Sequence, residues 1–438
     1  MTITFIGHGY VGLVSACVFA DFGNKVWVIG HTKEKIERLK KGDPIIYEPG
    51  LKELLEKNLN ANRIFFTHEY NHAIPESDIV FIAVGTPSKN NGEADLSTVY
   101  EVSKNIGKHL KKGFTVVSCK STVPVGTNKK IETILLESKP RSAGSKPNRS
   151  QVQVASCPEF LREGSAIYDT LNPDRVVIGS DSKKVIETLI ELHKPIDGKR
   201  VITDLASAEL IKYTSNAMLA TKISFANFIA FYCQKTGADV ENVLDAVGLD
   251  KRIGRIFMNP GVGYGGSCLP KDVKALIKIG KNHNLDTIFL EAVDRVNRQS
   301  QENFLHKILQ NVKTKTIALW GLTFKPNTDD IREAPSIFII TKLLENGFSI
   351  KVFDPVGMHN IKRLFGQRLI YSNSPYEAVK DVSGLAILTE WNEFKQADLK
   401  KVKSLMKRPV VFDGRNMYYP QMMRKLGFTY FSVGRPPV

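Results

Sequence analysis

The sequence lacks the features that would assign it to several common protein classes. Its five cysteines are odd in number and form no CxxC pair, so neither a zinc site nor a disulfide framework is expected; they are Cys17, Cys119, Cys157, Cys233 and Cys268. No apolar run reaches the roughly 18 residues of a membrane-spanning helix, and MTITFIG enters a strand pattern without a basic leader. These absences predict a protein of the reducing cytoplasm that holds no metal and does not insert into a membrane.

Long basic runs are also missing, although the chain is strongly basic. It carries 61 Lys and Arg residues against 45 Asp and Glu residues, a formal net charge of +16. Because the lysines are scattered and no stacking aromatic motif accompanies them, nucleic-acid binding is not the favoured interpretation. A basic surface that attracts anionic nucleotides explains the charge more simply.

Strand patterns alternate with helical segments at both ends of the chain. The N-terminal strands are TITFIG, KVWVIG, DIVFIAVG, FTVVSCKS, VQVASCP and RVVIGS, and the C-terminal strands are TIALWG, SIKVFDP, LAILTE and PVVFDG. Such alternation predicts parallel sheets covered by helices. The stretch SKPRSAGSKPNRS, residues 138–150, is polar and rich in Ser, Lys, Pro and Arg, so we expect an exposed loop there.

Between these regions the strand pattern gives way to helix. The run ELIKYTSNAMLATKISFANFIAFYC predicts a long, mostly buried helix from about Thr203 to Gln234, which ends near Gly237. We therefore predict an α/β protein with two Rossmann-like, doubly wound parallel-sheet domains, residues 1–200 and 311–438, joined by a central all-α segment, residues 201–310. A chain of 438 residues exceeds what one hydrophobic core usually supports, which agrees with several domains.

The segment GHGYVG follows the first strand and opens a helix, the context that a dinucleotide fingerprint requires. Gly7 permits the tight turn, Gly9 lets the backbone approach a pyrophosphate, and Gly12 lets helix and strand pack closely. Tyr10 and Val11 complete the predicted cofactor-binding turn.

The acidic residue expected at the end of the second strand is missing. In KVWVIGHTKEK that place is taken by Gly30 and His31, with Lys33 and Lys35 following. Without a carboxylate, a 2′-phosphate is not repelled, so NADP stays open beside NAD. Backbone groups or Lys35 would then contact the ribose of NAD.

The tract GVGYGGSCLPKD places Cys268 between a glycine-rich loop and a predicted helix start at Pro270. The partial positive charge of a helix N-terminus, with Lys271 nearby, would favour the nucleophilic thiolate, and Asp272 can turn back toward the same site. The alternative is that Cys268 is a small buried residue in a tight turn, as lone cysteines often are.

Two further pairs of polar residues are candidates. Lys212 and Asn216 lie four residues apart in the long helix, hence on one face, and form either a solvated stripe or a paired site. Glu159 and Glu163 follow a strand in CPEFLREGS, where strand ends meet a cofactor crevice, although surface acids would need no explanation.

Taken together, the motifs resemble those of the UDP-glucose/GDP-mannose dehydrogenase family from the first strand to roughly residue 420. The matching motifs, in the family's order, are GHGYVGLVSA, VGTPS, KSTVPVGT, CPEFLREGSA, ELIKYTSNAMLATKISFAN, GVGYGGSCLPKD, GLTFKPNTDDIREAPS, LTEWNEF and VFDGRN. The resemblance implies a four-electron, NAD-dependent oxidation of a sugar-nucleotide primary alcohol to a carboxylate, with UDP-glucose converted to UDP-glucuronate for polysaccharide or further sugar nucleotides.

The resemblance also implies roles for individual residues. Cys268 would carry the thiohemiacetal and thioester, Lys212 and Asn216 would stabilise developing oxygen charge, Asp272 and Thr122 would hold a water, and Glu159 would act as general base. The implied cofactor contacts are Gly7, Gly9, Tyr10, Val11, Gly12, Gly30, Lys35, Thr86, Thr122, Glu163, Lys271 and Arg332. The implied substrate contacts are Glu159, Phe160, Leu161, Arg162, Glu163, Lys212, Asn216, Arg252, Phe257, Met258, Asn259, Pro260, Gly261, Gly265 and Lys325.

The long helix is the usual dimer core in such enzymes, so a homodimer is expected, with Arg252 reaching the partner subunit's site. The chain departs from the family pattern at Gly30, which replaces the ribose aspartate, and at His8, Val262 and Tyr264. Two alternatives stay open: the same chemistry on GDP-mannose or a UDP-N-acetylhexosamine, and a catalytically silent nucleotide-binding paralogue. The intact Cys268 argues against a silent paralogue.

Overall fold

The computed structural model describes residues 1–110, 113–139 and 152–438. They divide into two compact units, Met1–Ser215 and Asn216–Val438, with the boundary inside helix α9 (Leu205–Thr236). Apart from its first two residues, the loop expected over 138–150 lies outside the described residues. The domain boundaries expected near residues 200 and 310 stay predictions.

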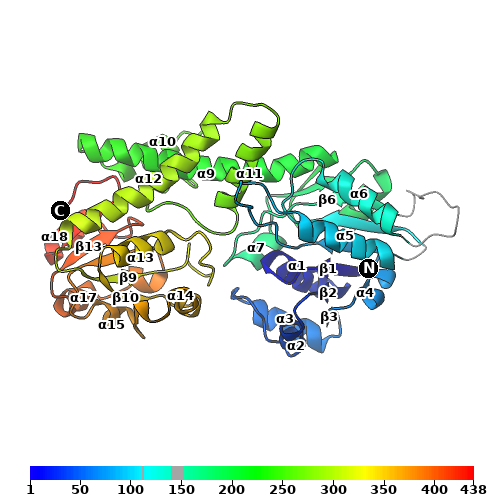
Figure 1. Cartoon of the computed structure of the whole chain (residues 1–438), viewed down its shortest axis with the longest axis horizontal. Coiled ribbons are helices and arrows are strands. Elements are labelled where there is room, and N and C mark those ends of the chain that lie inside the picture. The colour runs from blue at the N-terminus through cyan, green and yellow to red at the C-terminus, as the bar shows by residue number, and fades with distance from the viewer. Residues whose placement is uncertain (111–112, 140–151) are drawn as a thin grey trace. The chain divides into compact units, whose positions relative to one another are not determined.

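The described residues of the first unit contain one eight-stranded sheet in the order β3-β2-β1-β4-β5-β6-β7-β8 (Figure 1). Its strands are β1 (Thr2–Ile6), β2 (Lys25–Ile29), β3 (Ile64–Thr67), β4 (Ile79–Ile82), β5 (Thr115–Cys119), β6 (Val152–Ser156), β7 (Arg175–Gly179) and β8 (Lys199–Thr203). The strand order reverses between β1 and β4, and ligands of doubly wound folds bind beyond the carboxyl ends of the strands at such a point.

Two features of this sheet differ from the sequence-based prediction. Strands β3 and β8 were not expected, because neither carries a long apolar run. The pairing of β6 with β7 is antiparallel, through Ser156 and Gly179, so the sheet is not parallel throughout. The segment between these strands, with only the short helix α7 (Ala166–Leu171), turns the chain back on itself.

Apolar residues cover both faces of the central strands, and this explains the layered packing. In β4, Ile79 and Phe81 join the apolar cluster with α1 (Tyr10–Asp21), whereas Val80 and Ile82 join the cluster with α5 (Ser97–His109) and α6 (Thr127–Ser138). A strand buried on both faces requires such an unbroken apolar run. The helices of this unit are α1 (Tyr10–Asp21), α2 (Lys33–Lys40), α3 (Leu51–Asn60), α4 (Tyr70–Glu76), α5 (Ser97–His109), α6 (Thr127–Ser138), α7 and α8 (Lys183–Leu192).

The second unit contains a six-stranded parallel sheet, as far as its described residues show, in the order β11-β10-β9-β12-β13-β14 (Figure 1). Its strands are β9 (Thr316–Trp320), β10 (Ser349–Phe353), β11 (Ile370–Tyr371), β12 (Leu385–Ile387), β13 (Val410–Asp413) and β14 (Thr429–Ser432). The same strand order as in the first six strands of the other unit makes this a second doubly wound sheet. The expected fold class is therefore confirmed.

Helices precede and cover this second sheet. Those before it are the remainder of α9, α10 (Val240–Gly248), α11 (Leu269–Asn282) and α12 (Ile288–Asn311). Those that cover it are α13 (Pro335–Glu345), α14 (Met358–Phe365) with the short 3₁₀ helix Gly366–Arg368, α15 (Pro375–Val379), α16 (Asn392–Lys395), α17 (Leu399–Leu405) and α18 (Pro420–Leu426).

Helix α9 is not mostly buried, contrary to the expectation. Met218 is 58% exposed, Phe225 47% and Tyr232 58%, and Phe228 beside them is also exposed. A spacing of seven residues places Met218, Phe225 and Tyr232 in one stripe along the helix. The sequence could not separate the core-facing side of this helix from the exposed one, because both sides are apolar.

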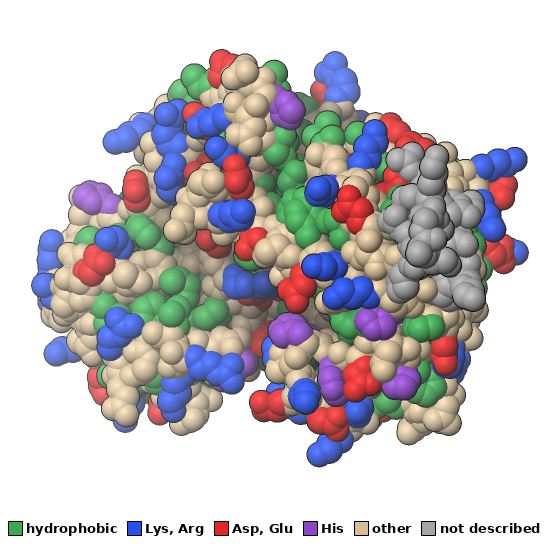
Figure 2. Space-filling view, turned by 45° about the vertical axis from the view of Figure 1, so that its right-hand side comes forward, with side chains coloured by type: hydrophobic (Ala, Val, Ile, Leu, Met, Phe, Trp, Pro, Cys, Tyr) green, Lys and Arg blue, Asp and Glu red, His purple; other side chains and the backbone are tan. Residues whose placement is uncertain are grey.

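On the face drawn in Figure 2, Lys and Arg side chains are dispersed among acidic and uncharged residues. Among the described residues, no helix combines the length and the apolar character needed to cross a bilayer. Likewise, no group of three or more His, Cys, Asp or Glu side chains in the described part of the chain is arranged to hold a metal ion.

Candidate active site

The turn between β1 and α1 has the geometry of a phosphate-binding loop. Gly7 has φ +116°, and a Cβ there would lie 2.2 Å from the carbonyl oxygen of Ala83. A Cβ at Gly12 would lie 2.1 Å from the oxygen of Gly7, whereas a Cβ at Gly9 would meet no described atom within 4 Å. Gly9 is also the N-cap of α1 and provides no side-chain cap. The N-terminal amides of α1 therefore face an uncrowded turn, which fits the pyrophosphate of a dinucleotide.

At the end of β2, the place of the missing acid is filled by a histidine. A Cβ at Gly30 would lie 2.2 Å from Cδ2 of His8. His8 is buried, and this burial, followed by the positive charges of Lys35 and His31, lowers the pKa of its imidazole. The ring is therefore neutral at neutral pH.

Two predicted cofactor residues meet at the carboxyl edge of the sheet. The hydroxyl of Thr86, after β4, donates a hydrogen bond of 2.9 Å to the carbonyl oxygen of Thr122, after β5. Thr86 is buried and Thr122 is half-buried. Both lie at the strand ends where a bound dinucleotide is expected.

Lys212 and Glu159 form a buried ion pair. Nζ of Lys212 lies 3.2 Å from Oε1 of Glu159, and the two side chains are only 5% and 9% exposed. The other carboxylate oxygen of Glu159 accepts a hydrogen bond of 2.7 Å from the backbone N–H of Leu161. Lys212 is therefore not part of a solvated stripe, and Glu159 is not a surface acid. The pairing orients both groups.

The rest of the CPEFLREGS loop is held by residues that the sequence did not identify. Arg175 stacks 3.9 Å from the centre of the Phe160 ring. Both carboxylate oxygens of Glu48 accept backbone N–H groups, from Gly164 at 2.6 Å and Ala166 at 2.7 Å. No local sequence signal identifies Glu48, because its partners lie far away along the chain.

The remaining acidic and basic residues of this loop lie nearer the surface. Arg162 is exposed and forms an ion pair of 2.7 Å with Asp169, whereas Glu163 is half-buried. Tyr10, in the phosphate-binding turn, donates its hydroxyl to the carbonyl of Tyr47 at 2.9 Å.

Cys268 is the N-cap residue of α11 and is exposed. The helix begins at Leu269, one residue before the predicted start, so Pro270 is its second residue. The hydroxyl oxygen of Ser267 lies 3.6 Å from the Cys268 sulfur. The interpretation of Cys268 as a buried turn residue is therefore wrong.

The other four cysteines differ clearly from Cys268. Cys17, Cys119, Cys157 and Cys233 are buried, and burial raises the pKa of each thiol, to about 12 for Cys17 and Cys119. A high pKa keeps these thiols protonated and unreactive. Among the cysteines, Cys268 is thus the candidate nucleophile.

Asp272 lies in the first turn of the same helix and is fully buried. Its carboxylate accepts hydrogen bonds from Nδ2 of Asn216 and from Nζ of Lys271, both at 2.5 Å. The ammonium of Lys271 is therefore neutralised by its neighbour, so it contributes less positive charge toward Cys268 than the sequence suggested. Asn216, like Lys212, is a fixed, buried group of α9.

Long-range hydrogen bonds hold the glycine-rich loop before Cys268. The backbone N–H of Gly261 donates to Asn227 at 2.7 Å, and that of Tyr264 donates to Asn297 at 2.8 Å. The guanidinium of Arg415 donates to the carbonyl of Gly263 at 3.1 Å. The sequence analysis assigned no role to these three anchoring side chains, although Asn227 lies in the quoted motif ELIKYTSNAMLATKISFAN and Arg415 in VFDGRN.

Close packing against a neighbouring backbone explains why position 265 of this loop is a glycine. A Cβ at Gly265 would lie 2.2 Å from the carbonyl oxygen of Glu333. The remaining predicted residues of the second unit lie on neighbouring loops: Met258 and Pro260 are buried, Asn259 is exposed, and Phe257 has φ +65°. Lys325 packs near the Phe324 ring, while Arg252 and Arg332 each pair with an aspartate two residues before them.

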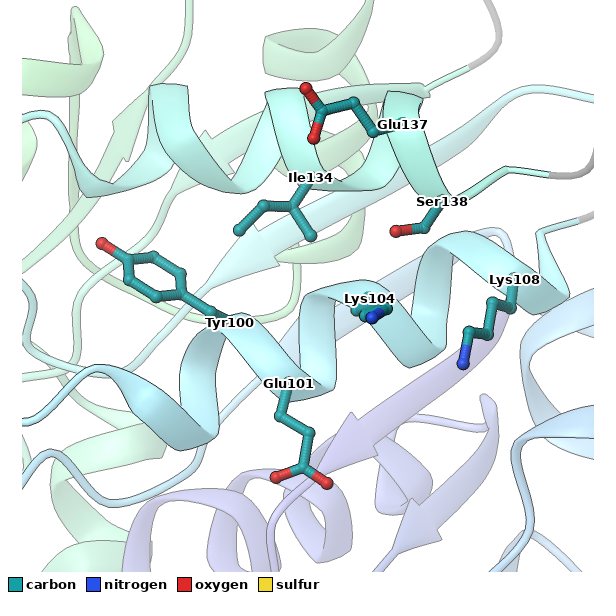
Figure 3. A pocket seen from close by; sticks show the side chains of 7 residues that line it. All are labelled: Tyr100, Glu101, Lys104, Lys108, Ile134, Glu137 and Ser138. Carbon is teal, nitrogen blue, oxygen red and sulfur yellow. The ribbon is translucent and has the colours of Figure 1, made fainter.

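Figure 3 shows a groove of mixed polarity on the first unit, between α5 and α6. Its lining residues are Tyr100, Glu101, Lys104, Lys108, Ile134, Glu137 and Ser138. None of them belongs to the predicted site. The groove therefore plays no part in the candidate active site.

The chain is similar to known proteins along its whole length. Models of the UDP-glucose/GDP-mannose dehydrogenase family match residues 1–197 as the NAD binding domain, 206–299 as the central domain and 318–420 as the UDP binding domain. UDP-glucose 6-dehydrogenase TuaD of Bacillus subtilis (strain 168) is 46% identical over 439 residues, which cover 100% of this chain and 94% of the relative. The UDP-glucose 6-dehydrogenase of Rhizobium meliloti (strain 1021) is 44% identical and covers 100% of both chains. A solved UDP-glucose dehydrogenase from the hyperthermophilic archaeon Pyrobaculum islandicum superposes with a TM-score of 0.90 at 36% identity, over 99% of this chain and 98% of that chain.

Proposed function

Because this chain belongs to the UDP-glucose/GDP-mannose dehydrogenase family, we propose that it oxidises UDP-glucose to UDP-glucuronate with NAD, through a covalent intermediate on Cys268. The observation that carries this proposal is the position of Cys268, exposed at the N-cap of α11 while the other cysteines are buried. A helix N-terminus favours a thiolate, the form of cysteine that attacks carbonyl carbon.

Residues of the first unit would hold the cofactor. Gly7, Gly9 and Gly12 form the turn that receives the pyrophosphate, and Thr86 and Thr122 lie at the neighbouring strand ends. When bound, NAD supplies the hydride acceptor for each of the two oxidations.

Cys268 would act between the two oxidations. Its thiolate adds to the aldehyde carbon and the carbonyl oxygen gains a proton, which gives a thiohemiacetal. Loss of a hydride and of the hydroxyl proton from this group leaves a thioester. Water then breaks the carbon–sulfur bond, so the carboxylate leaves and the thiol is regenerated. Covalent capture keeps the reactive aldehyde from escaping between the two steps.

The buried polar groups would stabilise charge and move protons. Lys212 and Asn216 would stabilise the negative charge that develops on the substrate oxygen, since a fixed donor costs no reorganisation during the reaction. Glu159, held by Lys212, would accept the proton of the attacking water, which Thr122 and Asp272 would position. The hydrogen bonds that fix Glu159 and Asp272 support these roles.

A panel of sugar nucleotides tests the substrate assignment. UDP-glucose, a UDP-N-acetylhexosamine and GDP-mannose would each be offered with NAD, with Cys268→Ser as the control enzyme. We expect UDP-glucose to give two molecules of reduced cofactor per molecule of UDP-glucuronate, measured by absorbance and product mass. Preferential turnover of another sugar nucleotide would reassign the substrate, and turnover of none would favour a silent paralogue.

We further propose that the protein is a homodimer formed through α9. The exposed apolar side chains of Met218, Phe225 and Tyr232 support this, since an apolar stripe on a helix commonly marks an interface. Activity in the cytoplasm stays a prediction, in accord with a reaction that depends on a reduced thiol.

A further inference from the structure

The end of β2 lacks the carboxylate that normally recognises the adenosine ribose, and the structure contains another polar group in its place. A Cβ at Gly30 would lie 2.2 Å from Cδ2 and 3.0 Å from Nε2 of His8, and 2.8 Å from Cδ1 of Ile36. The His8 ring thus occupies the space into which a side chain at position 30 would project. Gly30 and His8 are therefore coupled: the ring fits only because residue 30 has no side chain.

The His8 ring is buried, and one of its nitrogens has no partner. The residue is 8% exposed, and within the described part of the chain Nε2 makes no hydrogen bond. Burial of such a nitrogen costs free energy unless a ligand or water pairs with it. The ring of His31 lies 5.5 Å away at an interplanar angle of 28°.

The protonation of the ring follows from its surroundings. Burial, then the positive charges of Lys35 and His31, lowers the pKa of His8, so the imidazole is neutral. In a neutral imidazole one ring nitrogen donates and the other accepts. With the proton on Nδ1, the unpartnered Nε2 is available as a hydrogen-bond acceptor for a ligand hydroxyl.

We propose that His8 recognises the adenosine ribose of the cofactor, with Nε2 accepting a hydrogen bond from the ribose 2′-hydroxyl. This inference rests on the proposed NAD-dependent function and names the residue that sets its cofactor preference. A 2′-hydroxyl can donate a proton to Nε2, whereas a fully ionised 2′-phosphate has none to donate. The preference for NAD over NADP therefore depends on one neutral hydrogen bond rather than on charge repulsion, so we expect it to be modest.

The test measures cofactor binding directly, without turnover. Isothermal titration calorimetry of the full chain with NAD and with NADP gives both dissociation constants for the wild type, His8→Phe, Gly30→Asp and the double variant His8→Ala/Gly30→Asp. His31→Ala serves as the control, because it removes a neighbouring imidazole and leaves Nε2 of His8 in place. Circular dichroism and UDP-glucose binding establish that each variant is folded.

His8→Phe keeps the ring and loses the acceptor, so we expect NAD binding to weaken by about fivefold to tenfold, the scale of one net hydrogen bond, with NADP binding changed by less than about twofold. Gly30→Asp alone should weaken both cofactors, because its Cβ collides with His8. The double variant lacks the His8 ring, and the remaining close atom, Cδ1 of Ile36, is the end of a flexible side chain that can shift. It should therefore accommodate the carboxylate and recover NAD binding while rejecting NADP by at least about tenfold. His31→Ala should bind NAD within about twofold of the wild type.

Unchanged NAD binding in His8→Phe, or tighter NAD binding in Gly30→Asp alone, would overturn the inference. A double variant that fails to recover NAD binding would also overturn it. These outcomes are distinguishable from failure of the proposed function, because the wild type could oxidise UDP-glucose while His8→Phe binds NAD normally. Conversely, the His8 pattern could hold in binding while the wild type oxidises no UDP-sugar.

Discussion

The ion pair between Lys212 and Glu159 allows a stability effect to be separated from a catalytic one. The two charged atoms lie 3.2 Å apart and both side chains are nearly inaccessible to solvent. Removing one partner of such a pair leaves a buried, uncompensated charge and typically costs about 3–5 kcal/mol. Lys212→Met keeps most of the side-chain volume, so the loss measured is mainly that of the charge.

We expect Lys212→Met and Glu159→Gln each to destabilise the first unit by about 3–5 kcal/mol. For a unit of this size, about 1 kcal/mol shifts Tm by roughly 2–4 °C, so each single variant should melt roughly 6–20 °C lower. The Tm of the double variant should lie well above the value expected if the two single-variant losses simply added, because the double variant leaves no unpaired charge. A difference of about 1–3 kcal/mol from additivity is expected for groups in direct contact.

Differential scanning calorimetry measures these shifts, and added NAD identifies the transition of the first unit because a ligand raises the Tm of the unit that binds it. Turnover of UDP-glucose is measured on the same samples. We expect the double variant to regain stability and yet to remain at least about a hundredfold slower than the wild type, since it lacks the charged donor. Simple additivity of the two stability losses, or single variants that melt within about 2 °C of the wild type, would refute the reasoning.

Four other outcomes are expected. Cys268→Ser should fold and bind nucleotides, because serine is a good N-cap. It should form no UDP-glucuronate in a steady-state assay that detects the product by mass, and UDP-glucose should slow alkylation of the wild-type thiol. Gly12→Ala should abolish NAD binding and lower Tm, since its Cβ would lie 2.1 Å from a backbone oxygen, whereas Gly9→Ala should fold normally and weaken only NAD binding by calorimetry. Burial, followed by the charge of Lys120, lowers the pKa of His193 to about 3, so below about pH 6.5 the unfolded chain binds a proton that the folded chain does not. As the pH falls through this range, the free energy of unfolding should decrease by about 1.4 kcal/mol per pH unit. His193→Gln should remove that contribution, measured by thermal unfolding at pH 7 and pH 5. Phe225→Glu should convert the proposed dimer to monomers by light scattering, because it places a charge in the exposed apolar stripe of α9, and an unchanged dimer mass would move the interface elsewhere.

The parts of the fold that sequence reasoning predicted depend on short-range signals. The strand, glycine turn and helix of GHGYVG lie within one stretch of chain, and the start of α11 was predicted to within one residue of Leu269. Strands buried on both faces, such as β4, can be recognised in the sequence by continuous apolar runs. The fold class could therefore be predicted from the sequence alone.

Edge strands could not be predicted in the same way. β8 is half exposed and reads KRVIT, with no apolar run, and it forms because it pairs with β7. β11 has only two residues, which pair with β10. Their hydrogen-bond partners lie outside any local window of sequence, so neither composition nor periodicity identifies them.

By itself, the sequence determined where the nucleotide turn, the reactive cysteine and the helical pair Lys212 and Asn216 lie along the chain. Conformational preferences of glycine, proline and apolar repeats act over a few residues and can be read locally. Only the tertiary structure decided that Lys212 is paired with Glu159, that Asn216 holds Asp272, and that His8 fills the space beside Gly30. Charge state, burial and hydrogen bonding at a site depend on which distant segments the sheet and helices bring together, and those contacts leave no local pattern in the sequence.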